Sequence, residues 1–340
     1  PFLSKNDEWA GFEAVTNHPG EKILSNLTGS YVRDAYLQGL TLQDQGKPNP
    51  FNFGVIGSSD THVAGGSYTE ETHFSKIGLL DGEPYLRGSV PFDGIYGFLV
   101  KLWQPDSMIE IDEKNYLSFS SRLIRFGSSG LAGVWAEENT RESIYNAFRR
   151  KETFGTSGPR IKVRFFAGYN FENSNLYDSN LIQEAYSKNT PMGGDLIKEK
   201  DKNPKFLVWA ISDPLGAPLE RIQIIKGWLA EGEQMEKVFD VACSDGQSVN
   251  SQTHRCPNNN AQVNLDDCSI NRDKGDAEIK TFWQDPEFDN GQEAVYYARV
   301  LENPTCRWST WDAVRAEETP RSDIPVTIQE RAWSSPIWYK

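Results

Sequence analysis

Residues 222–228 read Ile222-Gln223-Ile224-Ile225-Lys226-Gly227-Trp228, a short, largely apolar run of the kind that forms a buried β-strand. Further runs with an apolar or alternating pattern occupy residues 161–166, 206–211, 238–242, 294–301 and 325–328. Turn-forming residues such as Asp213, Pro214 and Gly216 separate the runs, and no amphipathic helical pattern stands out between them. The pattern predicts an antiparallel β-sandwich domain over residues 158–340.

The first 157 residues have a different pattern. Residues 30–42 carry apolar side chains at helical spacing behind Ser30 as a candidate cap, and an apolar, strand-like run follows from Phe51. A helix followed by a strand is the repeating unit of α/β barrels and layered sheets. Asn139 and Glu142 have the spacing of a capping box and predict another helix. The turn-forming residues 156–159 then mark a domain boundary, which we place between positions 157 and 158.

A long connection lies between these two predicted helices. Residues 63–129 contain aromatic side chains that are repeatedly interrupted by glycine and proline, without a regular period. Connections of this length are more often a lid or a binding loop than a passive link. We therefore expect this loop to border a site.

Composition excludes some classes of function. The chain has 340 residues and a net charge of −13, with acidic residues scattered along it, so a general affinity for nucleic acid is not expected. Its 10 Trp, 13 Tyr and 18 Phe are enough for substantial apolar cores. The sequence contains no apolar run long enough for a membrane span.

The cysteines favour an oxidising compartment. Cys243, Cys256 and Cys268 fall in one polar stretch, the fourth is Cys306, and their spacing fits no zinc-binding pattern. Two disulfides would restrain a long loop with little core of its own. That interpretation favours an exported protein, periplasmic or extracellular, whereas the alternative is four unrelated reduced thiols.

The run from Phe51 ends in Asp60 and His62, the strongest candidates for metal ligands. Residues i and i+2 of an extended chain project to the same face, so a carboxylate and an imidazole can share one cavity. Both groups are ordinary ligands of Zn, Mn or Fe. Ser58 and Ser59 are small, turn-compatible residues that would line such a site. The alternative is that Asp60 caps a helix beside a packed His62.

Other residues could line the same site. His73 could approach it from the long loop, or could simply be solvated. Ser157 and Arg160 could bind an anion through a hydroxyl and a guanidinium, or could belong to a structural turn. Glu137 and Glu138 could act as a general base or as outer-shell acids, although their position before a predicted helix already explains them electrostatically.

Six stretches of the chain together resemble the DUF3604 family. They are residues 57–62 (Gly-Ser-Ser-Asp-Thr-His), 133–141, 151–160, 191–196, 222–228 and 330–339. DUF3604 proteins resemble the polymerase-and-histidinol-phosphatase (PHP) superfamily, in which a distorted β/α barrel holds two or three metal ions and phosphoesters are hydrolysed. The resemblance implies that residues 1–157 are part of such a barrel, and Asp60 and His62 match its Asp-x-His metal ligands.

The resemblance also implies that ligands lie outside this sequence. Family members are about twice as long, and their first half carries a His-x-His motif that none of the four histidines here forms. The chain resembles the C-terminal half, and its partner would be an N-terminal half or a second chain. Two functions follow as hypotheses. One is metal-dependent hydrolysis of a small phosphoester-like substrate in the complete protein, and the other is a non-catalytic structural or carbohydrate-binding module that uses exposed Trp and Tyr.

Overall fold

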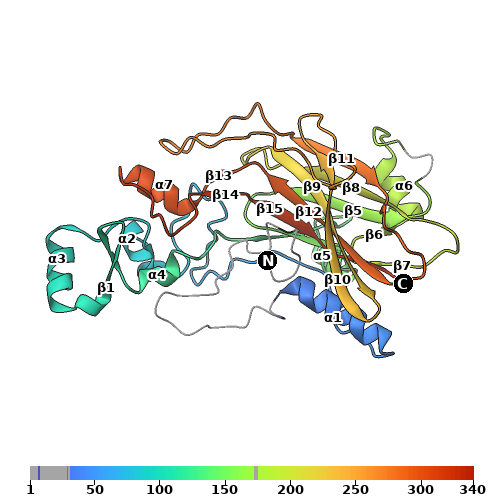
Figure 1. The fold of residues 1–340 in the computed structure, drawn as a ribbon, viewed down its shortest axis with the longest axis horizontal. Coiled ribbons are helices and arrows are strands. Elements are labelled where there is room, and N and C mark those ends of the chain that lie inside the picture. Colours follow the sequence, from blue (N-terminus) through green and yellow to red (C-terminus); the bar gives the residue numbers. More distant parts are fainter. Residues whose placement is uncertain (1–6, 8–28, 30, 172–174) are drawn as a thin grey trace.

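The computed structural model describes residues 7, 29, 31–171 and 175–340, and it is built around two sheets that are antiparallel except for the parallel pair β16–β7 (Figure 1). The larger sheet has eight strands, in the order β10-β9-β12-β15-β4-β3, with β16 on β12 and β7 on β16. Its strands are β3 (Leu131–Val134), β4 (Thr153–Thr156), β7 (Asp195–Leu196), β9 (Leu219–Ala230), β10 (Glu233–Cys243), β12 (Ala294–Glu302), β15 (Arg331–Ser334) and β16 (Ile337–Tyr339). The smaller sheet has the order β11-β8-β5-β6. Its strands are β5 (Lys162–Gly168), β6 (Thr190–Pro191), β8 (Lys205–Ile211) and β11 (Glu278–Trp283).

One apolar core joins the two sheets. Phe165 and Val208 of the smaller sheet pack in the same cluster as Ile224, Tyr296 and Ala332 of the larger one, and all five are essentially inaccessible to solvent. Each large apolar side chain buried in this way contributes about 1.5–3 kcal/mol. The two sheets and the loops between their strands are called the two-sheet body below.

Lys226 interrupts the apolar run that opened the sequence, yet it is buried in β9. Its Nζ lies 2.6 Å from a carboxylate oxygen of Asp285, which also accepts a hydrogen bond of 2.8 Å from the Tyr296 hydroxyl. The Asp285 carboxylate offsets the desolvation of the Lys226 ammonium group, so β9 can bury this lysine.

Helix α1 (Val32–Asp44) confirms the first predicted helix and covers the outer face of the larger sheet. Tyr36 and Leu37 pack there with Val295 and Trp338. The candidate cap at Ser30 lies outside the described residues. Helix α6 (Leu181–Lys188) covers the outer face of the smaller sheet in the same manner.

The predicted strand at Phe51 is wrong. Residues 52–60 join no strand ladder, and Asp60 has a left-handed φ of +52°, so the extended spacing expected to place Asp60 and His62 on one face is not present. Two main-chain hydrogen bonds connect the segment to its neighbours, Gly57 N to Leu131 O (3.1 Å) and Gly130 N to Ser58 O (3.2 Å). A side chain at Gly57 would place its Cβ 2.4 Å from the Leu131 carbonyl oxygen. The main chain at Gly57 therefore passes too close to β3 for any residue with a side chain.

The described residues contain no closed barrel. β3 and β4, which precede position 157, are antiparallel to each other and belong to the larger sheet, where β4 pairs with β15. The hydrogen-bonded sheet therefore continues across the position at which the sequence predicts a domain boundary. Helix α5 (Arg141–Arg149) connects these two strands, and its cap is Thr140 rather than Asn139, because the Thr140 hydroxyl accepts from Ser143 N at 3.3 Å.

The predicted long loop contains short regular elements. They are η1 (Gly78–Leu80), α2 (Pro84–Arg87), α3 (Gly94–Trp103), η2 (Pro105–Ser107), β1 (Met108–Ile111), β2 (Lys114–Leu117) and α4 (Ser120–Leu123). Together with α7 (Trp308–Arg315) they form an arm that projects from the two-sheet body (Figure 1). Ile124, Trp308 and Ile324 form its small core, and both ends of the Arg87 guanidinium bind Asp312, at 2.6 and 2.7 Å.

The four cysteines form two disulfides, Cys243–Cys256 and Cys268–Cys306, which confirms the expected oxidised state. Cys306 lies in the short strand β13 (Thr305–Cys306), which pairs with β14 (Thr327–Ile328) outside the two large sheets. In the part of the chain that the structure describes, no helix has the length and apolar character needed to span a membrane.

Candidate functional site

Asp60 and His62 lie on an exposed loop and adopt a specific local geometry. Asp60 has a φ of +52°, a left-handed conformation, and its carbonyl oxygen lies 2.9 Å from Nδ1 of His62. The His62 main-chain N–H donates to Lys76 O at 2.8 Å, which fixes the base of the loop. A carbonyl contact at Nδ1 favours the tautomer that is protonated there and leaves Nε2 as an acceptor.

This loop exposes two side chains of types that can bind a metal ion. None of the described residues donates a hydrogen bond to the Asp60 carboxylate or forms an ion pair with it, and the contact of His62 Nδ1 with a carbonyl oxygen is of the kind that accompanies metal-binding histidines. Structural and catalytic sites need three or four protein ligands. Within the described ranges, no group of three His, Cys, Asp or Glu residues is placed to hold a metal. The loop therefore fits part of a metal site.

The other predicted residues do not gather around Asp60. The Glu137 carboxylate accepts from the Ser143 hydroxyl at 2.9 Å and pairs with Arg150 at 3.0 Å, while Glu138 is exposed beside it. Both lie at the start of α5, as the electrostatic alternative requires. Ser59 contacts the Thr61 hydroxyl at 3.0 Å, within the loop itself.

His73 is buried rather than solvated. Its ring stacks on Trp308 with centroids 4.6 Å apart, and its Nδ1 has no hydrogen-bond partner among the described residues. Burial, and then the nearby charge of Arg87, lower the pKa of His73 to about 4. The side chain is a neutral packing element of the arm.

A cleft of about 830 Å³ opens where the two-sheet body meets residues 66–74 and α7. Arg160 is the only predicted site residue in its lining. Residues 66–72 and Phe74 also line it, so the predicted long loop does border this cleft. The lining residues with polar, charged or aromatic side chains that matter here are Tyr68, Glu70, Arg160, Asp213, Arg272, Glu302, Trp311 and Glu330. Its size is that of a ligand site.

Arg160 closes one side of the cleft. Its guanidinium carbon lies 4.8 Å from the centre of the Tyr68 ring, and one of its nitrogens donates to the Tyr68 hydroxyl at 2.7 Å. The main-chain N–H of Arg160 donates to Asp213 at 2.7 Å. Arg160 therefore fixes Tyr68 to the turn at Asp213.

Ser157 connects the predicted residues to the carboxyl groups of the cleft. Its hydroxyl donates to the Glu330 carboxyl group, and its oxygen accepts from Arg331 N at 2.8 Å. Burial, followed by the charge of Glu70, raises the pKa of Glu330 well above its usual range. Ser58 and Ser157 also line a separate pocket of about 270 Å³.

Glu302 is the most isolated carboxyl group of the cleft. It ends the buried strand β12 and is 1% exposed; one oxygen accepts from Ala217 N at 3.2 Å, and the other has no hydrogen-bond partner among the described residues. Burial raises the pKa of Glu302 to about 8, and the nearby charge of Asp213 acts in the same direction. At neutral pH this carboxyl group is therefore mostly protonated.

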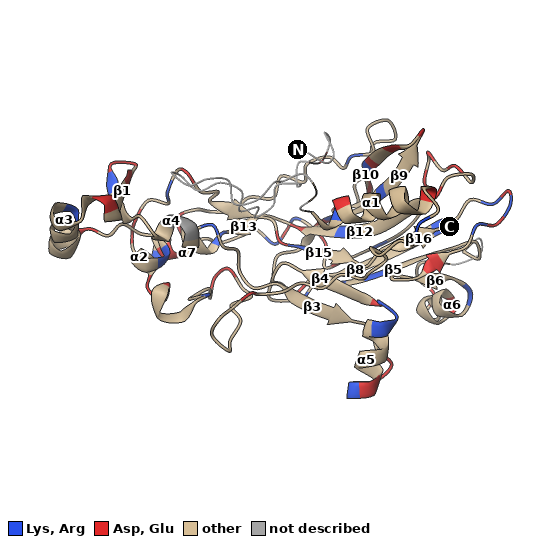
Figure 2. Cartoon of the chain, turned by 90° about the horizontal axis from the view of Figure 1, so that it is seen from below, with Lys and Arg blue, Asp and Glu red and all other residues tan. Residues whose placement is uncertain are grey.

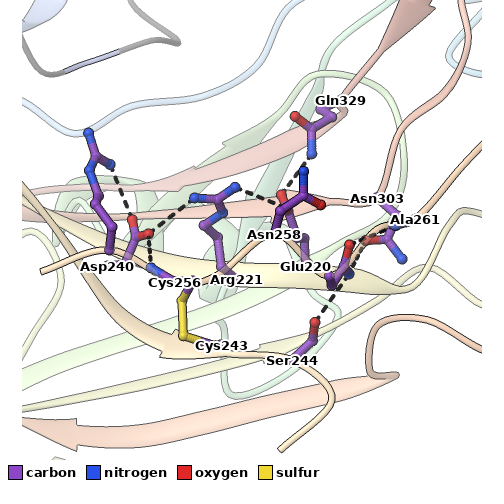
Figure 3. A network of polar contacts seen from close by, with 12 residues as sticks. Glu220, Arg221, Asp240, Cys243, Ser244, Cys256, Asn258, Ala261, Asn303 and Gln329 are labelled. Carbon is purple, nitrogen blue, oxygen red and sulfur yellow. Dashed lines mark hydrogen bonds and ion pairs between the residues drawn. A yellow bond between two sulfur atoms is a disulfide. The ribbon is translucent and has the colours of Figure 1, made fainter. Parts of the chain in front are cut away.

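A polar network holds the strands beneath the cleft in place (Figure 3). Arg221 of β9 lies between two acids, at 2.9 Å from Glu220 and 3.1 Å from Asp240. Gln329 donates to Glu220 at 2.8 Å and to the Glu302 carbonyl at 3.0 Å. Asp240 also accepts from Cys256 N at 2.7 Å, which secures the loop that the first disulfide closes.

Charge is dispersed elsewhere. Figure 2 shows acidic and basic residues interspersed over the loops and helix ends of the described chain. That the chain has no general affinity for nucleic acid stays a prediction.

The comparisons with known proteins give one match. A family model described as a protein of unknown function, DUF3604, covers residues 1–340. Among curated proteins and solved structures, none matches the chain.

Proposed function

The chain belongs to the DUF3604 family, and on that premise we propose that it contributes part of the metal centre of a hydrolase that acts on phosphoester-like substrates. Asp60 and His62 are the ligands it supplies. The remaining ligands come from a further segment or a second chain, as the resemblance to PHP-like barrels implies. We also class the two-sheet body as a β-sandwich and propose that the protein is exported.

The observation that carries this proposal is the geometry of His62. The contact between its Nδ1 and the Asp60 carbonyl, at 2.9 Å, is the outer hydrogen bond that orients metal-binding imidazoles. A divalent ion bound there would lower the pKa of a bound water and stabilise charge on an ester oxygen. The role of this chain is to present Nε2 of His62 and the carboxylate of Asp60 in a fixed relation, with the Lys76 carbonyl holding the loop.

The test uses Mn²⁺ as a paramagnetic probe and ¹³C-labelled histidine. Even weak binding to two ligands broadens the signals of a coordinating ring, so His62 is expected to broaden at a lower Mn²⁺ concentration than His254. Asp60→Asn should remove that difference because it removes one of two ligands, whereas Glu233→Gln, an exposed substitution on β10, should not. Equal broadening of His62 and His254, or an unchanged response in Asp60→Asn, would contradict the metal-ligand role.

The hydrolytic part of the proposal needs the complete centre. Joined to an N-terminal half that carries the His-x-His motif, the chain should bind metal and cleave bis(p-nitrophenyl) phosphate. Asp60→Ala and His62→Ala should each lose both bound metal and turnover. Retention of the metal by both variants would rule out these two ligands.

The second candidate function is carbohydrate binding without catalysis. The cleft of about 830 Å³ supports it, because Tyr68 and Trp311 stand in its lining beside carboxyl groups that can bind hydroxyls. A glycan screen that finds no ligand for the chain, together with phosphoesterase activity in the complete protein, would eliminate this candidate.

A further inference from the structure

Three carboxyl groups of the cleft lining matter here, those of Asp213, Glu302 and Glu330, and the guanidinium groups of Arg160 and Arg272 line the same cleft. Asp213, Glu302 and Glu330 are buried, and none of these three forms an ion pair with a lysine or arginine among the described residues. A buried carboxyl group is costly unless it is protonated, accepts hydrogen bonds or pairs with a positive charge. Asp213 accepts main-chain hydrogen bonds from Arg160 and Leu215, at 2.7 and 3.0 Å, so Glu302 and Glu330 are the groups that need explanation.

Glu302 supplies an independent sign of a missing partner. One of its oxygens is buried without a hydrogen bond from any described residue, although the side chain lines an open cleft. Gly216 lies directly over it, since a Cβ at that position would be 2.9 Å from this oxygen. A native protein rarely leaves such a group unsatisfied without a water, an ion or a ligand for it.

We propose that this cleft binds an organic cation, a ligand with an ammonium or guanidinium group that donates to Glu302 and is held between it and the neighbouring acids. The inference goes beyond the proposed hydrolase and does not depend on Asp60 or His62. An ammonium or guanidinium group carries several N–H donors and the charge that the cleft lacks.

The aromatic side chains favour a cation over a sugar. The Tyr68 ring already has the Arg160 guanidinium 4.8 Å from its centre, and the Trp311 ring has that of Arg315 at 5.0 Å. One face of each ring is therefore occupied, which reduces the stacking surface that a sugar ring would use. The buried carboxyl groups of Glu302 and Glu330, rather than the aromatic rings, therefore lack a basic partner among the described residues.

Binding of a cation is coupled to loss of a proton. Besides burial, Asp213 raises the pKa of Glu302, whereas the Ala217 N–H and Arg272 lower it. For Glu330, burial and the charges of Glu70 and Glu302 raise the pKa, whereas the Ser157 hydroxyl and Arg331 lower it. Burial keeps Glu302 protonated up to a pKa of about 8. An incoming cation favours its ionised form, so affinity should rise with pH towards that value, with release of about one proton per ligand.

Calorimetric titration with agmatine, which carries one guanidinium and one ammonium group, tests the proposal. The expected result is tighter binding at pH 8.5 than at pH 6.5, and a binding heat at pH 6.5 that changes with the ionisation enthalpy of the buffer. Glu302→Gln keeps the shape but cannot ionise, so it should weaken binding at pH 8.5 by about 10- to 100-fold and remove the pH dependence. Pentane-1,5-diol, a neutral molecule of similar length, should not bind.

Two further variants separate charge from shape. Gly216→Ala places a methyl group against the Glu302 oxygen and should weaken agmatine binding while every charge is kept. Glu233→Gln, an exposed substitution, should leave it unchanged. If Glu302→Gln does not fold, the proton release and pH dependence of the unmodified chain still decide the question. Absence of agmatine binding, equal affinity at both pH values, or binding of cellotetraose in its place would overturn the proposal.

Discussion

Two regions of this protein carry carboxyl groups in opposite environments. The Asp60 carboxylate stands on an exposed loop beside His62, whereas Glu302 and Glu330 are buried in the wall of a cleft. The loop presents a charged ligand to solvent. In the cleft, burial raises the pKa of both Glu302 and Glu330. The two environments underlie the two proposals, a metal ion at the loop and an organic cation in the cleft.

The largest expected effect concerns Glu302. In the folded chain it keeps its proton up to a pKa of about 8, against an ordinary value of 4.5, so the folded state binds more protons and stability falls as pH rises between these values. Glu302→Gln removes this loss. Relative to the unmodified chain, the variant should gain about 3–5 kcal/mol in free energy of unfolding on going from pH 5 to pH 9.

Denaturant unfolding at both pH values measures this gain. Asp60→Asn is the matched control, because its exposed carboxylate contacts no described partner and its removal should leave the stability at each pH within experimental error. A gain in the control as large as that in Glu302→Gln would break the comparison between the two regions.

The second prediction concerns His73, the buried histidine that packs against the arm. His73 has a pKa of about 4 in the folded chain against an ordinary 6.5, so the unfolded state takes up a proton first and stability falls as pH decreases from about 6.5 to about 4. His73→Phe keeps an aromatic ring against Trp308 and should reduce that acid-induced loss by roughly 2–3 kcal/mol. Unfolding curves at pH 7 and pH 4 check it, and the same acid loss in both proteins would refute it.

The smallest effect separates two serines. Ser157→Ala removes the donor to the buried Glu330 carboxyl group and should cost about 1–2 kcal/mol. Ser58→Ala, in the exposed loop segment, removes a hydroxyl for which the described residues provide no hydrogen bond and should cost much less. Thermal unfolding of both variants gives the comparison, and equal losses would show that the Ser157 contact stabilises nothing.

Apolar runs were enough to predict most of the two-sheet body. The runs at 206–211, 222–228, 238–242 and 294–301 lie within β8, β9, β10 and β12, and the run at 161–166 overlaps all but the last two residues of β5. The strand predicted from Phe51 was wrong because apolar composition alone does not distinguish a paired strand from an unpaired segment that runs against a sheet. The short helices of the arm have too few residues to show a helical period.

The cleft could not be predicted because its carboxyl groups come from four distant parts of the chain. Glu70, Asp213, Glu302 and Glu330 meet only after the sheets and the arm have packed. Two signals could have identified some of them: Glu302 ends a strand that is otherwise apolar over most of its length, and Glu330 begins one of the stretches that carry the family resemblance. Arg160 and Ser157 were predicted as neighbours of a site, but for an anion.

The proposed cation site requires that Glu302 be protonated in the free chain and give up its proton when a cation binds. Carbon-13 NMR of glutamate carboxyl groups over a pH series tests it most directly, with Glu302 assigned by the signal that Glu302→Gln removes. We predict a midpoint of about 8 for Glu302 in the free chain, and a lower midpoint in the presence of agmatine. A midpoint near the ordinary 4.5 in the free chain would contradict the account.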